Sequence, residues 1–214
     1  MKLFVWDFHG TLEKGNENAV LEMSNFVLEK HGYKQRLLES QCRELYGKKW
    51  YEYFEYLLPD ESNATHLALQ EDCFSFSIAH PEIIVKYISL VDHALEVLEA
   101  IKEKHDQILI SNTKPASLAV FTQSVGVSHI FPNGKSFATD SHAKNKTKKD
   151  VLRKYLSRNI FEEVITIGDS PGDVELGAVF GAKTFLYTHP GQAFKDCEPY
   201  FKINDLREVL KVMQ

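Results

Sequence analysis

Aspartate and serine side chains follow three of the apolar runs in this sequence. Asp7 and Asp169 each come directly after such a run, Asp173 lies one helical turn beyond Asp169, and Ser111 ends the run Ile108-Leu109-Ile110. Open α/β sheets bind ligands at the carboxyl ends of their strands, so we expect these side chains to share one pocket. Three carboxylates so close would repel one another unless a cation lay among them, and Mg²⁺ favours a few carboxylate oxygens together with phosphate oxygens.

Five short runs rich in branched and aromatic residues predict the strands that would position these groups. They lack polar alternation, which is typical of strands buried on both faces of a parallel sheet. The predicted strands cover residues 3–8, 107–112, 163–168, 183–187 and 200–203. Helical patterns lie between them at 150–156 and 173–180, and another carries Val91, Leu95, Leu98 and Ile101 on one face. The alternation predicts an α/β fold, a three-layer Rossmann-like parallel-sheet core.

About ninety residues between the first two predicted strands show no strand pattern. Helical patterns cover 18–31, 37–58, 65–76 and 82–105, separated by turn residues such as Gly32, Pro59 and Pro81. We therefore expect a helical domain at 15–90 inserted into an α/β core formed by 1–14 and 91–214. Within the insertion, Trp50, Tyr53, Phe54 and Leu57 have helical spacing and are expected to form its own core.

The composition limits which kinds of binding partner and which cellular compartment we expect for the protein. The 214 residues are 43% hydrophobic and 26% charged, with a formal net charge of -5, which favours a globular protein without a nucleic-acid partner. Three dispersed cysteines indicate neither a disulfide framework nor a zinc site, and no apolar run reaches membrane-spanning length. These features predict a cytoplasmic monomer or dimer without a membrane partner.

Two segments resemble motifs of the haloacid dehalogenase (HAD) superfamily of phosphatases. Residues 7–12, Asp-Phe-His-Gly-Thr-Leu, are similar to its first motif, Asp-x-Asp-Gly-Thr-Leu, and Gly168–Asp173 match its Gly-Asp-x-x-x-Asp motif. The resemblance implies that Asp7 attacks phosphorus and becomes an aspartyl phosphate, with the insertion acting as a cap. It further implies a small phosphorylated metabolite as substrate and Mg²⁺ as cofactor. The implied metal ligands are Asp7, the His9 backbone carbonyl, Asp169 and Asp173, and the implied substrate-binding residues are Gly10, Thr11, Ser111 and Asn112.

The resemblance also implies a lysine that neutralises charge on the nucleophile and the phosphate. Four lysines precede the predicted helix at 150–156. Alignment on the longer form of the family's lysine-containing motif places that lysine four residues before Asp150, at Lys146. Alignment on shorter forms of the same motif places it at Lys148. Thr147 and Asp150 form a capping-box pattern, which puts Lys148 at the first helical position and Lys146 in the preceding loop. We prefer Lys146 because a loop residue reaches a pocket more easily, and we keep Lys148 as the alternative.

His9 departs from the first motif, where the family has a second acid that protonates the leaving oxygen. Imidazole can do acid-base work near neutral pH, so His9 could replace that acid in a phosphatase. If it fails as an acid, turnover would be restricted to substrates with good leaving groups, such as acyl phosphates. A third possibility is a protein that binds phosphate or a partner without turnover. A dehalogenase is disfavoured, because the paired acids of the Gly-Asp-x-x-x-Asp motif would then have no metal ion to bind.

The remaining histidines match no metal-binding pattern such as H-E-x-x-H. We expect surface positions for His31, His66, His93, His105 and His129. His189 follows the predicted strand at 183–187 and is expected in a loop at the ligand end of the sheet. In the insertion, residues 46–51 are the stretch expected to face the pocket, with Lys48 or Lys49 available to the substrate.

Overall fold

The computed structural model describes residues 1–45, 48–139, 147–190 and 197–213. The chain divides into two compact units. Met1–Lys14 and Leu90–Gln214 form an α/β unit, and Gly15–Ser89 form a helical unit. The chain passes between the units at two short strands, β2 (Glu13–Lys14) and β3 (Ser89–Leu90), which pair with each other.

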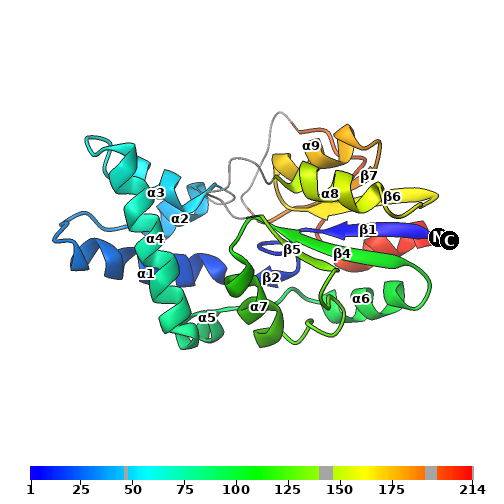
Figure 1. The fold of residues 1–214 in the computed structure, drawn as a ribbon, viewed down its shortest axis with the longest axis horizontal. Coiled ribbons are helices and arrows are strands. Elements are labelled where there is room, and N and C mark those ends of the chain that lie inside the picture. Colours follow the sequence, from blue (N-terminus) through cyan, green and yellow to red (C-terminus); the bar gives the residue numbers. More distant parts are fainter. Residues whose placement is uncertain (46–47, 140–146, 191–196, 214) are drawn as a thin grey trace. The chain divides into compact units, whose positions relative to one another are not determined.

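The α/β unit is built on a six-stranded parallel sheet of order β5-β4-β1-β6-β7-β8 (Figure 1). Its strands are β1 (Lys2–Trp6), β4 (Asp106–Ser111), β5 (Ser136–Ala138), β6 (Glu163–Gly168), β7 (Lys183–Tyr187) and β8 (Phe201–Ile203). The chain runs outward from β1 to β5, then returns to β6 beside β1 and continues to β8. The carboxyl ends of β1 and its neighbours therefore form a topological switch point, where such sheets bind ligands. The predicted Rossmann-like α/β core is confirmed.

Helices cover both faces of this sheet. They are α6 (Ala94–Lys102), α7 (Pro115–Ser124), α8 (Lys148–Leu156) and α9 (Pro171–Val179), followed by a C-terminal 3₁₀ segment, η1 (Leu206–Met213). Successive residues of β1 point to opposite faces. Trp6 donates its indole N–H to Gln107 (3.2 Å), whose amide donates to the Leu98 carbonyl of α6 (2.8 Å). Leu3 and Val5 point to the other face.

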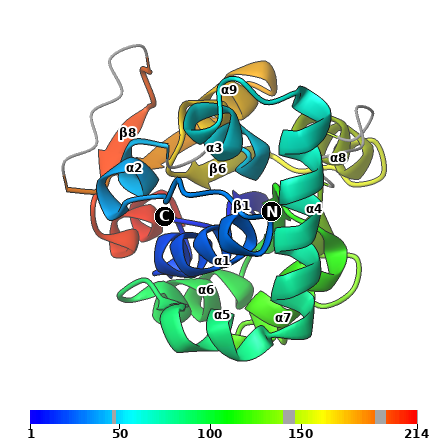
Figure 2. The same ribbon diagram turned by 90° about the vertical axis from the view of Figure 1, so that its left-hand side faces the viewer.

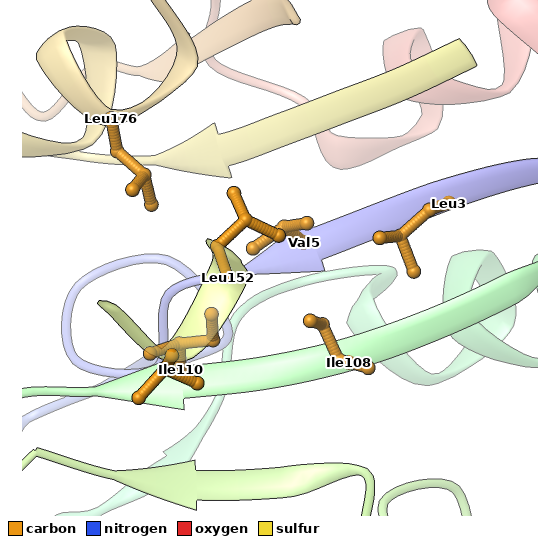
Figure 3. Close-up of a cluster of buried hydrophobic side chains, with 7 residues drawn as sticks. Leu3, Val5, Ile108, Ile110, Leu152 and Leu176 are labelled. Atoms are coloured by element: carbon orange, nitrogen blue, oxygen red, sulfur yellow. The ribbon is translucent and has the colours of Figure 1, made fainter. Parts of the chain in front are cut away.

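A buried apolar cluster on that other face anchors α8 and α9. Figure 3 shows Leu152 of α8 and Leu176 of α9 beside side chains from β1 and β4. The cluster consists of Leu3, Val5, Ile108, Ile110, Val151, Leu152 and Leu176. Each fully buried aliphatic side chain contributes about 1.5 to 3 kcal/mol of burial free energy. This packing fixes the N-terminal ends of both helices at the carboxyl edge of the sheet.

The helical unit contains α1 (Asn16–Lys30), α2 (Glu39–Glu44), α3 (Trp50–Leu57), α4 (Asn63–Ala79) and α5 (Pro81–Tyr87). Helix α4 packs against α1 and α3 (Figure 2). Phe54 and Tyr53 are buried in two separate apolar clusters, and Trp50 and Leu57 pack against both. The predicted core role of these four residues in this unit is confirmed. Gly15 precedes α1 with a φ of 98°, and a Cβ there would come 2.2 Å from the Tyr87 carbonyl oxygen. Among the described residues, no helix has the length and apolar character needed to cross a bilayer.

Two predicted helices are wrong as continuous elements. The helix expected at 37–58 is replaced by α2 and α3, and that expected at 82–105 is replaced by α5, β3 and α6. In the second case, long-range pairing overrides the local pattern: Val91 donates its backbone N–H to the Leu12 carbonyl (2.9 Å), and His93 takes a left-handed φ of 64°. Leu95 is 43% exposed, so it does not share the buried face of Val97, Leu98 and Ile101. Strand β5 was not predicted, because three residues carry too weak a pattern.

The predicted surface position of His66 is also wrong. Its side chain is buried in the helical unit, where Nε2 lies 2.9 Å from the Leu58 carbonyl oxygen. A hydrogen-bonded ring can replace an apolar residue in a core, which the sequence alone does not reveal. His105 is half-buried and stacks on Phe4, whereas His31, His93 and His129 are exposed as predicted.

Candidate functional site

Three carboxylates meet at the carboxyl edge of the sheet. Asp7 follows β1 and Asp169 follows β6, and these neighbouring parallel strands pair in a register that places Trp6 opposite Ile167. Asp7 also donates its backbone N–H to the Ile167 carbonyl (2.9 Å). Asp173 lies in the first turn of α9. All three residues are buried, and one carboxylate oxygen from each lies within 4.8 Å of the others.

Local sequence fixes the position of Asp173. Its Oδ2 accepts hydrogen bonds from the Ser170 hydroxyl (2.6 Å) and, more weakly, from the Ser170 backbone N–H (3.3 Å), which caps the start of α9. Gly168 makes room for it, because a Cβ on that residue would lie 2.3 Å from the Asp173 Cβ. The Gly-Asp-x-x-x-Asp motif thus places both of its acids beside Asp7.

Lys148 is the cation of this cluster. Its Nζ lies 2.5 Å from Asp7 Oδ1 and 2.7 Å from Asp173 Oδ1, and its side chain is 12% exposed. It is the first residue of α8, after the Thr147 cap that bonds reciprocally with Asp150, as predicted. The alternative lysine of the sequence analysis therefore contacts the nucleophile candidate from a helical position. The preferred lysine, Lys146, lies outside the described residues. Lys149 points elsewhere and pairs with the exposed Glu175 (2.6 Å).

Among the described residues, the site carries more negative than positive charge. Burial raises the pKa of Asp7 to about 7; Lys148 opposes this rise, and the charges of Asp173 and Asp169 add to it. Burial likewise raises the pKa of Asp169, partly offset by the His189 ring, whose Nε2 lies 3.3 Å from Asp169 Oδ2. Burial alone would lower the pKa of Lys148, but the charges of Asp173 and Asp7 raise it well above its ordinary value. One ammonium among three carboxylates leaves an environment that favours a further cation.

Two buried hydroxyl groups near the ends of β1 and β4 are available for a ligand. Neither Thr11 Oγ1 nor Ser111 Oγ has a hydrogen-bond partner within the part of the chain that the structure describes. Buried hydroxyl groups are ordinarily paired, so these two are candidates for hydrogen bonds to a ligand. Asn112 differs, because it is exposed and its Oδ1 accepts a hydrogen bond from the Thr139 hydroxyl (2.7 Å). Gly10 forms the turn after β1, with a φ of 74°.

His9 is held beside this cluster by aromatic and acidic neighbours. Its side chain is 22% exposed, and Nδ1 lies 3.3 Å from Oε1 of the fully buried Glu13. Its ring is edge-on to Phe8 (5.2 Å between centroids) and to Phe121 (4.9 Å). Burial would lower the pKa of His9, but the hydrogen bond and charge of Glu13, together with Asp7 and Asp169, raise it above its ordinary value.

Glu13 was not predicted as a site residue. The only sequence signal was an acid four residues after His9, and it stands at the start of a polar segment, residues 13–18, that reads as a surface turn. His189 lies in the loop after β7, where it was expected.

Comparisons with known proteins give the family and the fold of the chain. A family model of haloacid dehalogenase-like hydrolases matches residues 1–181. No curated protein matches. Similar solved structures include a haloacid dehalogenase-like hydrolase from Streptococcus pneumoniae, at 16% identity and a TM-score of 0.75, covering 99% of this chain and 98% of that one. A predicted phosphoglycolate phosphatase from Haemophilus somnus has 14% identity and a TM-score of 0.82, with 99% and 97% covered. A HAD-superfamily hydrolase from Geobacter sulfurreducens has 18% identity and a TM-score of 0.72, with 100% and 97% covered.

Proposed function

Since the chain belongs to the haloacid dehalogenase-like hydrolases, we propose that it is a Mg²⁺-dependent phosphohydrolase that acts on a small phosphorylated metabolite. The observation that carries this proposal is the buried group of Asp7, Asp169 and Asp173 around Lys148. Carboxylates at this density suit a divalent cation and a phosphoryl group, whose charges balance each other.

The residues present fit a magnesium ion. Asp7, Asp169 and Asp173, together with the His9 backbone carbonyl, would hold it, because all four offer the oxygen ligands that Mg²⁺ prefers. The raised pKa values of Asp7 and Asp169 support this assignment, since burial and the neighbouring carboxylates disfavour their charged forms and a cation would favour them. When bound, Mg²⁺ supplies positive charge beside the phosphoryl oxygens.

The protein side chains carry out the attack on phosphorus, the charge neutralisation and the proton transfers. Asp7 attacks phosphorus, so that its carboxylate oxygen bonds to the phosphoryl group as the bond to the leaving oxygen breaks. Lys148 balances negative charge on Asp7 and on the phosphoryl group, and the Ser111 and Thr11 hydroxyls donate to phosphoryl oxygens. His9 gives a proton to the leaving oxygen. It then takes one from the water that attacks the aspartyl phosphate, which releases phosphate and regenerates Asp7.

Two other functions follow from His9 itself. If imidazole cannot reach the leaving oxygen, the enzyme would hydrolyse only acyl phosphates, whose leaving group needs no proton. If neither step proceeds, the protein would bind phosphate or a partner through the same residues. If the protein is a phosphohydrolase, as we propose, the helical unit acts as a cap that excludes water and selects the substrate.

The test is phosphate release from a panel of alkyl phosphomonoesters and acetyl phosphate, measured with Mg²⁺ and with EDTA. We expect Mg²⁺-dependent release from at least one monoester. Release confined to acetyl phosphate would favour the restricted enzyme, and His9→Asp should then restore monoester turnover. The absence of Mg²⁺-dependent release from folded protein would favour the binding protein.

Mg²⁺ should also stabilise the folded protein, whether or not the panel contains its substrate. At a free concentration of 100 times Kd, an ion that binds only the native state adds about 2.7 kcal/mol, which corresponds to a rise of about 5 to 10 °C in Tm for a chain of this size. Asp169→Asn should abolish the rise, whereas Glu175→Gln, an exposed acid on α9, should leave it unchanged. Thermal denaturation with and without Mg²⁺ measures it, and an equal rise in Asp169→Asn would contradict the assigned ligands.

A further inference from the structure

Glu13 is a buried acid with a single side-chain partner in the described part of the chain. Its relative exposure is 0%, and its Oε1 lies 3.3 Å from His9 Nδ1. Oε2 is buried and has no hydrogen-bond partner among the described residues. Burying a carboxylate is unfavourable unless it is paired, so a buried acid facing one histidine points to a role that involves that histidine.

Backbone hydrogen bonds in the turn after β1 bring the two residues together. The backbone N–H groups of Leu12 and Glu13 both donate to the Phe8 carbonyl (3.0 and 3.1 Å), and Gly10 donates to the Glu13 carbonyl (3.1 Å). The chain therefore turns back on itself after β1, and residues 9 and 13 form an isolated bridge. Glu13 consequently reaches the ring from a hydrogen-bonded turn.

The ring is also restrained on its apolar sides. Phe8 and Phe121 both meet it edge-on, with interplanar angles of 79° and 83°. Glu13 occupies the Nδ1 side. An imidazole confined in this way offers its other nitrogen, Nε2, for proton exchange.

We propose that Glu13 is the positioning residue for His9. Its carboxylate accepts the Nδ1–H of the imidazole, which sets the tautomer and leaves Nε2 as the nitrogen that exchanges protons. In the first step, the Nε2 proton passes to the leaving oxygen. In the second step, a proton of the attacking water passes to Nε2, while Nδ1 keeps its own proton throughout. This inference rests on the proposed function, in which His9 performs the acid-base work.

The kinetic test compares Glu13→Leu, which removes the acceptor, with Glu13→Gln, which keeps an amide oxygen in its place. For an alkyl phosphomonoester, we expect Glu13→Leu to lower kcat by on the order of 10²-fold with KM unchanged, since misplaced general acid-base catalysis costs at least that much. Acetyl phosphate needs no proton on its leaving group, so its kcat/KM, which reports formation of the aspartyl phosphate, should fall only by roughly tenfold. Glu13→Gln should recover most of the lost rate. Equal losses of kcat/KM for both substrates, or no loss for the monoester, would overturn the proposal.

A second measurement does not depend on turnover. In ¹⁵N-labelled protein at about pH 9, the neutral His9 ring, assigned with His9→Asn, should carry its proton on Nδ1 in the wild type and shift toward Nε2 in Glu13→Leu. A wild-type ring protonated on Nε2 would overturn the positioning role even in an active enzyme. An Nδ1–H ring in a protein without phosphatase activity would instead sustain the positioning and reject the proposed function.

Discussion

Asp7→Asn is expected to abolish phosphate release, with a fall in kcat on the order of 10⁴-fold or more. Asp7 supplies the oxygen that bonds to phosphorus, and an amide oxygen is a far weaker nucleophile than a carboxylate. The protein should remain folded, because Asn fits the same space. Its Tm without Mg²⁺ should be equal to or above that of the wild type. The pKa of about 7 at Asp7 means that the ionised carboxylate is disfavoured in this crowded site.

The measurement is single-turnover release of phosphate, together with a search for a covalently phosphorylated chain after acid quenching. Asp60→Asn, an exposed aspartate of the helical unit, is the matched control and should retain wild-type kcat. Wild-type protein should trap the phosphoryl group on residue 7, and Asp7→Asn should not. Undiminished phosphate release by Asp7→Asn would reject the nucleophilic role.

Lys148→Met is expected to lower both activity and stability. Lys148 bridges two buried carboxylates, and removing one partner of a buried ion pair typically costs about 3 to 5 kcal/mol. The full loss in free energy of unfolding should appear in the absence of Mg²⁺ and above neutral pH, where Asp7 is ionised. The loss of a cation aimed at the phosphoryl group should lower kcat by roughly 10²- to 10³-fold.

Lys149→Met provides a control at the neighbouring position. Lys149 is partly exposed and its ion pair with Glu175 lies on the surface, so this variant should stay within about 0.5 kcal/mol of the wild type and keep its activity. Denaturant unfolding and steady-state kinetics on the two variants separate the roles. If Lys148→Met behaved like Lys149→Met and Lys146→Met lost activity instead, the motif lysine would be Lys146.

The sequence by itself determined the features that depend on short stretches of chain. Short apolar runs without polar alternation predicted the buried parallel strands, and the capping-box pattern predicted the start of α8 at Thr147. Because parallel strands end at the same edge of the sheet, the positions of Asp7 and Asp169 after apolar runs were enough to predict that they meet.

Only the tertiary structure decided which partners the site residues find. Local pattern placed Lys148 at the first position of α8 but could not show that packing of Val151 and Leu152 aims that helix start at Asp7. Pairing between β2 and β3 interrupted a segment whose apolar spacing favours a helix. Glu13 sits in a segment that reads as a surface turn, yet the turn after β1 buries it against His9. Spacing along the chain sets local geometry, whereas burial and charge pairing depend on residues that the fold brings from elsewhere.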